Sequence, residues 1–155
     1  MVSKVVCLAS LLLFTLAPSS SCSVEEPPPV CKDFYDLSGQ EREKQFPGYA
    51  VDRQLDIYRC EMKRKPPASG WAYDIAKGGE RKLSVVTERL KAERDPVMQY
   101  HFIHLIQIMS EEPYFRGKRE VADQVRQVIS RMDSSPAKTQ AQEALSEIEK
   151  NAKGD

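Results

Sequence analysis

The fold is decided by the stretch DPVMQYHFIHLIQIM, which runs from Asp95 to Met109. Asp95 followed by Pro96 is a strong helix start, because the carboxylate can cap the first turn and proline has no N–H to leave unsatisfied there. Apolar side chains cover most of the circumference of this predicted helix: Tyr100, Phe102, Ile103, Leu105, Ile106 and Ile108. A helix that is apolar on several sides is buried on several sides. We therefore expect it to be the central helix of the fold.

The segments around it have the spacing of amphipathic helices, and the alternation typical of strands is nearly absent. Gly78 and Gly79 would supply the positive backbone angles that commonly close a helix. The expected helices cover about 40–45, 50–64, 69–77, 80–94 and 119–132, with a thin apolar pattern in a last segment up to Ile148. The sequence thus predicts an all-α fold, either a small bundle or a stack of antiparallel helices.

One part of the chain resembles a known repeat architecture. The segment IAKGGE, Ile75–Glu80, is followed by Leu83, Val86 and Leu90, and it resembles HEAT-like helical repeats, in which a tight turn joins antiparallel helices. The resemblance covers about residues 71–132 and rests on spacing. It implies an interaction scaffold.

The start of the chain carries an export signal. Lys4 precedes an apolar run from Val5 to Ala17, and small residues follow, which is the layout of a secretory signal peptide. The run is shorter than the roughly 20 apolar residues that span a bilayer. We expect a signal peptide over 1–21, a Pro-rich tether over 22–32, a helical domain over 33–133 and a polar C-terminal helix or tail over 134–155.

Two cleavage patterns fit this signal. Small residues at Ser19 and Ser21 suit an ordinary signal peptidase, which would release a soluble secreted protein. The run also resembles a bacterial lipoprotein signal, in which the cysteine after the small residues is lipidated and becomes the first residue. Cys22 would be that cysteine, although Ser19 stands where an aliphatic residue is usual. This resemblance implies a membrane-anchored protein that faces the periplasm or the cell exterior.

The cysteine count favours the lipoprotein interpretation. The chain has four cysteines, and Cys7 lies in the signal peptide. Lipidation of Cys22 accounts for the odd thiol and leaves Cys31 and Cys60 as a pair. Exported proteins keep disulfides because their compartment is oxidising. Since these two cysteines lie far apart in sequence, unlike a redox Cys-x-x-Cys, we predict a structural disulfide between them.

Charge and motifs exclude several classes of function. The chain has 23 basic and 23 acidic residues, and loss of the signal peptide removes only Lys4 from these. A nearly neutral protein lacks the basic surface that broad nucleic-acid binding needs. The sequence has no Gly-x-Ser-x-Gly elbow, phosphate-binding Gly-rich loop or His-Glu-x-x-His motif. We therefore expect no catalytic residues, no cofactor and no enzymatic activity.

His101 and His104 are the only histidines, and their i, i+3 spacing could bring the two imidazoles together on a helix. Most catalytic zinc sites use three protein ligands, and neither Glu111 nor Glu112 has the spacing of a third. Structural histidines on the flank of an apolar helix are the simpler interpretation. The sequence thus predicts an exported interaction domain whose partner is another envelope protein. The alternative is a metal-binding or enzymatic protein that uses His101 and His104.

Overall fold

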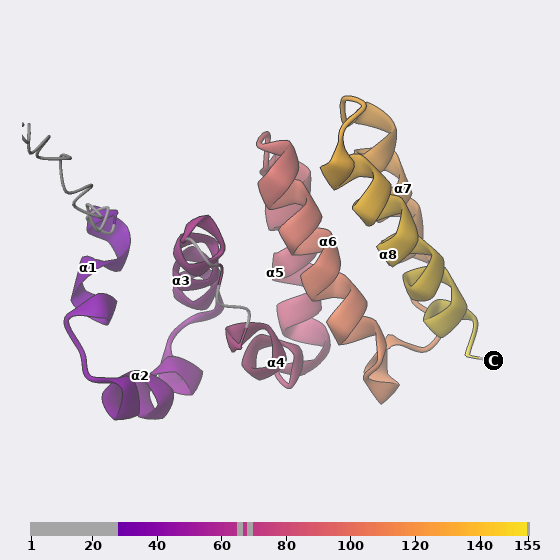
Figure 1. The fold of residues 1–155 in the computed structure, drawn as a ribbon. Coiled ribbons are helices and arrows are strands. Elements are labelled where there is room, and N and C mark those ends of the chain that lie inside the picture. Colours follow the sequence, from indigo (N-terminus) through magenta and orange to yellow (C-terminus); the bar gives the residue numbers. More distant parts are fainter. Residues whose placement is uncertain (1–27, 65–66, 68–69, 155) are drawn as a thin grey trace, which may run out of the picture.

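The computed structural model describes residues 28–64, 67 and 70–154. These residues form eight α-helices and two 3-10 turns, without a strand among them (Figure 1). The elements are α1 (Pro29–Tyr35), α2 (Gly39–Gln45), η1 (Phe46–Gly48), α3 (Val51–Lys63), α4 (Trp71–Ala76), α5 (Gly79–Ala92), α6 (Pro96–Ser110), η2 (Pro113–Phe115), α7 (Arg119–Arg131) and α8 (Pro136–Lys153). The predicted all-α fold is confirmed. The predicted signal peptide and Cys22 lie outside the described residues.

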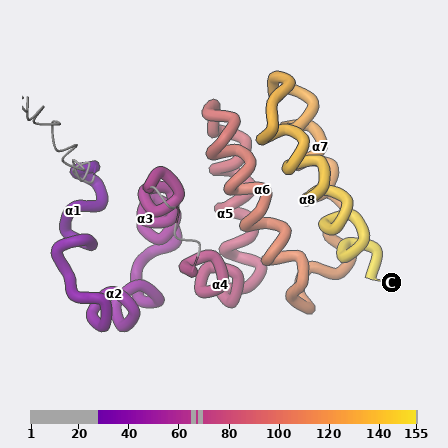
Figure 2. Tube along the Cα trace, viewed as in Figure 1, coloured from indigo at the N-terminus to yellow at the C-terminus, as the bar shows by residue number. Residues whose placement is uncertain are grey.

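From α3 onwards the helices are stacked as pairs. Within each pair, α3 contacts α4, α5 contacts α6, and α7 contacts α8. Between pairs, α3, α5 and α7 follow one another in one layer, and α4, α6 and α8 follow one another in the other. Figure 2 shows this succession along the chain, from the first helices in indigo to α8 in yellow. The arrangement is that of helix pairs in which each pair rests mainly on its neighbours.

Helix α6 has the central place that its sequence predicts. It contacts α3, α4, α5, η2 and α8. Its start is capped as expected, because the Asp95 carboxylate accepts a hydrogen bond from the Val97 N–H at 3.0 Å. Leu105 and Ile106 are fully buried. Among the described helices, α6 included, none is both long and apolar enough to cross a bilayer.

Helix α8 is packed onto the domain over most of the range 134–155, which the sequence suggested as a polar helix or tail. The side chains that it buries are small apart from one: Ala137, Ala141, Ala144, Ile148 and Ala152. Alanines let the backbone of α8 approach α6 closely, although they give only a thin apolar signal in the sequence. Two hydrogen bonds hold its last turns: Asn151 Nδ2 donates to Ser110 Oγ at 2.8 Å, and the Gly117 N–H donates to the Ala152 carbonyl at 3.0 Å.

The first helices close the other end of the stack. Helix α1 begins at Pro29, inside the range predicted as a tether. Phe34 on α1 is fully buried, and its ring contacts those of Tyr35, Phe46, Tyr49 and Trp71. These aromatic contacts draw α1, η1 and the start of α4 together. Residues 29–32 of the predicted tether therefore belong to α1, which the aromatic contacts of Phe34 anchor to the domain.

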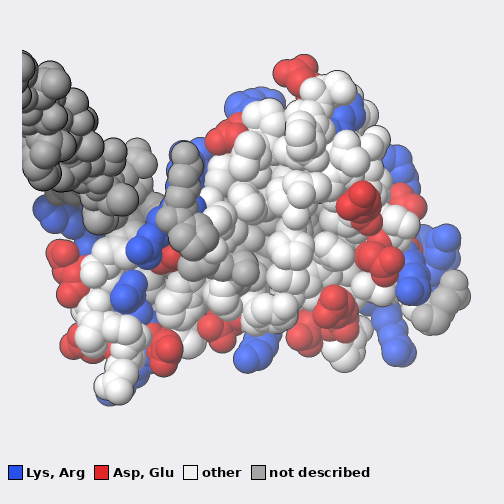
Figure 3. All heavy atoms as spheres, in the orientation of Figure 1, with Lys and Arg blue, Asp and Glu red and all other residues white. Residues whose placement is uncertain are grey.

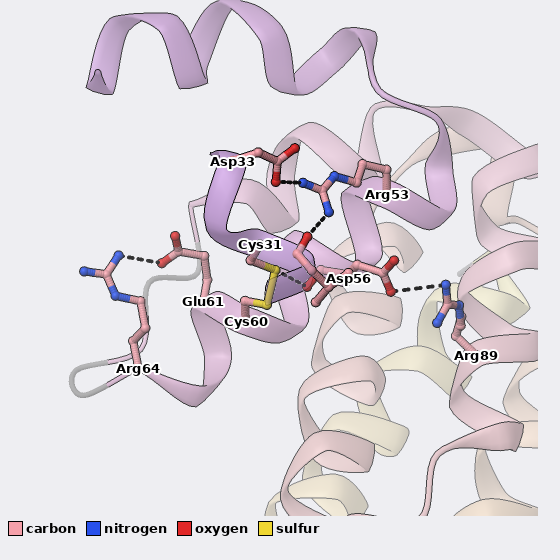
Figure 4. The surroundings of a disulfide bond; sticks show 9 residues. Cys31, Asp33, Arg53, Asp56, Cys60, Glu61, Arg64 and Arg89 are labelled. Carbon is pink, nitrogen blue, oxygen red and sulfur yellow. Dashed lines mark hydrogen bonds and ion pairs between the residues drawn. A yellow bond between two sulfur atoms is a disulfide. The ribbon is translucent and has the colours of Figure 1, made fainter. Parts of the chain in front are cut away.

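A disulfide fastens α1 to α3. The sulfur atoms of Cys31 and Cys60 are 2.08 Å apart, at disulfide distance, as the cysteine count predicted (Figure 4). Helix α1 covers the side of α3 that carries Cys60, so Cys60 is only 5% exposed. Ion pairs surround the bond: Arg53 of α3 binds Asp33 of α1, and Arg89 of α5 lies 3.3 Å from Asp56. Helix α3 is thus covered by α1 and also contacts α5.

The turn between α4 and α5 needs one special backbone angle. Gly79 has a φ of +76°, which side chains other than glycine rarely adopt. Gly78 has a φ of −79°, so the expectation of positive angles at both glycines was wrong for Gly78. The flexible stem of Lys82 occupies the space where a Cβ of residue 78 would lie.

Candidate interaction surface

The outer side of α6 is uncharged along its whole length. No Asp, Glu, Lys or Arg occurs from Pro96 to Ser110, although one side of this helix is open to solvent. The residues on that side, which we call the α6 stripe, are spaced at three and four positions: Val97, Tyr100, His101, His104 and Gln107. Val97 is 54% exposed, and the other four are half-buried. The stripe is thus a polar and apolar surface without Asp, Glu, Lys or Arg.

The second layer of the stack has a different surface. The exposed positions of α5 and α7 are largely charged: Arg81, Glu88, Lys91, Glu120, Asp123, Arg126 and Arg131. Figure 3 looks at the molecule from the side of α6, and charged side chains are sparse over this helix and gather around the edges of the face. The stack therefore has a charged layer and a layer whose central helix is uncharged.

Ring contacts and hydrogen bonds hold the stripe in place. The Tyr100 ring stacks against His104, with centroids 6.2 Å apart and an angle of 21° between the planes, and lies 5.3 Å from His101. His104 Nδ1 lies 3.1 Å from Gln107 Oε1. The buried Tyr58 of α3 donates its hydroxyl to the main-chain carbonyl of His101 at 3.0 Å. A surface that is already ordered loses little conformational entropy when it binds.

The electrostatic state of the stripe depends on its histidines. Burial lowers the pKa of His101 below its ordinary value, and the nearby His104 lowers it further, while Asp95 acts in the opposite direction. His101 is therefore neutral at pH 7 and adds no charge to the stripe. The Tyr100 ring contacts both imidazoles, so the two histidines lie on the same side of α6.

The structure does not complete a metal site around them within one chain. No group of three or more His, Cys, Asp or Glu side chains that could hold a metal ion occurs in the part of the chain that the structure describes. Glu111 lies past the last turn of α6, at its C-cap, and Glu112 follows it. His101 and His104 thus lie on one side of α6, and among the described residues no third candidate ligand is grouped with them.

The aromatic turn after α6 has a structural role. It is anchored in the core: Phe115 is fully buried, and Tyr114 Oη donates to the Ala76 carbonyl at 2.8 Å. Two basic residues near helix ends form ion pairs, Arg64 with Glu61 and Lys118 with Glu80. These contacts account for the Tyr114 turn and for both cations.

A shallow groove of about 370 Å³ lies between α7 and α8. Arg126 is central to it, and its guanidinium binds Glu149 at 2.6 Å and also Asp123. Because this cation is shared by two carboxylates of the groove itself, its charge is already compensated. The groove is the weaker candidate beside the α6 stripe.

Sequence reasoning placed the two histidines on α6 but did not recognise Val97, Tyr100 and Gln107 as their surface neighbours. The available signal was the run of 15 helical residues without a charge, which was interpreted only as burial. Burial explains why the side of such a helix that faces the core has no charged residues. The side that faces solvent usually carries charged residues in a surface helix. The chain matches no protein-family model, no curated protein and no solved structure.

Proposed function

We propose that this chain is an exported, lipid-anchored helical domain that binds another protein of the cell envelope through the α6 stripe, and that it catalyses no reaction. The observation that carries the proposal is the uncharged, ordered stripe on the central helix of a stack whose other layer is charged. The stacked helix pairs support a scaffold role, the role that a resemblance to HEAT-like repeats would imply.

The chemistry of the stripe suits a protein partner. The buried centres of protein interfaces are depleted in charged residues and enriched in aromatic ones. Tyr100 offers a rigid ring with few torsions to fix, and Val97 offers apolar area beside it. Histidine and glutamine can both donate and accept hydrogen bonds around that centre.

The proposed location outside the cytosol is supported by the N-terminal sequence and by the cysteines. The buried Cys31–Cys60 bond suits an oxidising compartment outside the cytosol. If Cys22 is lipidated, the Pro-rich sequence between Cys22 and Pro29 joins the lipid to the first helix. The substitution Cys22→Ser should then abolish acyl labelling and release the protein from membranes. An unmodified N-terminus at another residue, found by mass spectrometry, would contradict the anchor and leave simple secretion.

Charge insertion into the stripe tests the binding function. Val97→Glu places a carboxylate on the stripe, and Ser84→Glu places one on the exposed, charged side of α5 as a matched control. Burying an unpaired carboxylate in an interface costs several kcal/mol, so the partner's affinity should fall at least about tenfold for Val97→Glu. The measurement is quantitative mass spectrometry of proteins cross-linked to the tagged full chain in its own cells. Equal recovery of the same partner with both variants would reject the α6 stripe as the binding site.

A further inference from the structure

The two histidines of the α6 stripe have the spacing on a helix of ligands to a single ion. Side chains at i and i+3 of a helix have Cβ atoms about 5–6 Å apart, within reach of one metal ion. The Tyr100 ring stacks on His104 and lies beside His101, which limits the orientations of both imidazoles. Both side chains are half-buried, so one side of each is shielded and the other is open to solvent.

The contact of His104 with Gln107 suits a metal ligand. Nδ1 of His104 lies 3.1 Å from Gln107 Oε1, which accepts a hydrogen bond in the tautomer that carries the proton on Nδ1. The lone pair is then on Nε2, on the opposite side of the ring. Metal-binding histidines have this arrangement, in which the second ring nitrogen donates to an oxygen acceptor that orients the imidazole.

One chain supplies only half of a site. Zinc is bound by four ligands in structural sites, whereas the described part of this chain groups no third candidate with the two histidines. A second copy, related by a two-fold axis, would contribute the same two imidazoles and raise the number to four. Two-fold contacts join the same patch on both copies, so a pair of ligands is doubled by symmetry.

The charge of the stripe favours such a contact. Two copies of a surface rich in charges of one sign would repel each other, but the α6 stripe contains no Asp, Glu, Lys or Arg along its length. Val97 and Tyr100 lie beside the histidines and would be covered in the same contact. The α6 stripe of one chain can thus pack against the α6 stripe of a second copy without repulsion between charged residues.

From these observations, and resting on the proposed function of the α6 stripe, we infer that its partner is a second copy of this chain and that a divalent metal ion of the zinc class joins the copies through His101 and His104 of each.

The test uses zinc alone as the probe, added to protein purified from cells that express the full chain and stripped with EDTA. Calorimetry should give one zinc ion for two chains, and sedimentation should show monomers that become dimers with zinc and revert with EDTA. His101→Ala and His104→Ala should each abolish both effects. Gln107→Ala should weaken zinc binding by about 10–100-fold through the lost orienting contact. Gln142→Ala, at an exposed position of α8, is the matched control and should change nothing.

Several results would overturn the inference. They are zinc binding that survives both histidine substitutions, one zinc per chain without dimers, and dimers that ignore zinc. Dimers that ignore zinc but are lost in Val97→Glu would reject the metal and leave the proposed function standing. If the alanine variants fail to fold, cobalt(II) on the unmodified chain decides, because a tetrahedral site gives intense visible bands and an octahedral one, contrary to the inference, gives weak bands.

Discussion

The hydroxyl of Tyr58 donates a hydrogen bond to the main-chain carbonyl of His101 at 3.0 Å, across 43 residues of sequence. Tyr58 is fully buried on α3, so the bond joins the centre of the core to the backbone that carries the α6 stripe. Burial raises the pKa of this hydroxyl, which keeps its proton available for donation. The position of the stripe is therefore fixed from the inside of the molecule.

Removing that hydroxyl should have a moderate and measurable effect. Tyr58→Phe keeps the ring packing and loses one buried hydrogen bond, so the free energy of unfolding should fall by about 1 kcal/mol. Tyr73→Phe is the matched control, because Tyr73 is 58% exposed and its hydroxyl can be solvated. Urea denaturation of both variants measures the difference. Equal stabilities would mean that the Tyr58 bond does not stabilise the fold.

Because α6 is central, truncating one of its buried side chains should destabilise the fold more strongly. Leu105 is fully buried, and Leu105→Ala should lower the free energy of unfolding by about 2–5 kcal/mol. Val97→Ala on the exposed side of the same helix should change it by less than about 0.5 kcal/mol. Chemical denaturation gives both values. A loss below about half a kcal/mol for Leu105→Ala would mean that α6 is not central.

The burial of Tyr114 should make the stability of the fold depend on pH in the alkaline range. Burial, with a smaller contribution from Glu112, raises its pKa to about 12 in the folded chain. The unfolded chain releases this proton near the ordinary value of 10, so stability present below that pH is lost as the pH rises towards 12. Tyr114→Phe should lower stability at pH 7 by about 1 kcal/mol, through the lost bond to Ala76, and flatten the alkaline decline. An unchanged slope between pH 9.5 and about 11.5 would contradict this.

The disulfide predicts an ordered loss of structure. Cys31 and Cys60 are 29 residues apart, and closing a loop of that size contributes about 3–4 kcal/mol by chain entropy. Reduction should therefore lower the melting temperature and expose the α1–α2 segment to proteases before the later helices. Thiol counting on the folded, non-reduced protein is the decisive check. Free alkylation of both cysteines would show that the bond does not form.

Local signals in the sequence were sufficient to locate the central helix, whereas features that depend on tertiary packing were not predicted. Spacing and Asp95–Pro96 located α6 closely, since strong periodicity and a cap are local signals. Helix α1 was not predicted because seven residues after a Pro-rich stretch depend on contacts from distant parts of the chain, those of Phe34 and the Cys31–Cys60 bond. Whether the last helix packs on the domain could not be predicted, because the alanines of α8 act through small size rather than through hydrophobicity. The α6 stripe was missed because the sequence does not tell which side of an uncharged helix other elements leave open.

Photo-crosslinking from position 97 tests most directly whether a protein partner covers the α6 stripe. A photoreactive benzoylphenylalanine replaces Val97 in the full chain, in intact cells, and replaces Ser84 of α5 as the control. We expect a discrete cross-linked product from position 97, with the mass of two chains if the partner is a second copy, and none from position 84. Equal yields from the two positions, or no product from position 97, would contradict an interaction through the α6 stripe.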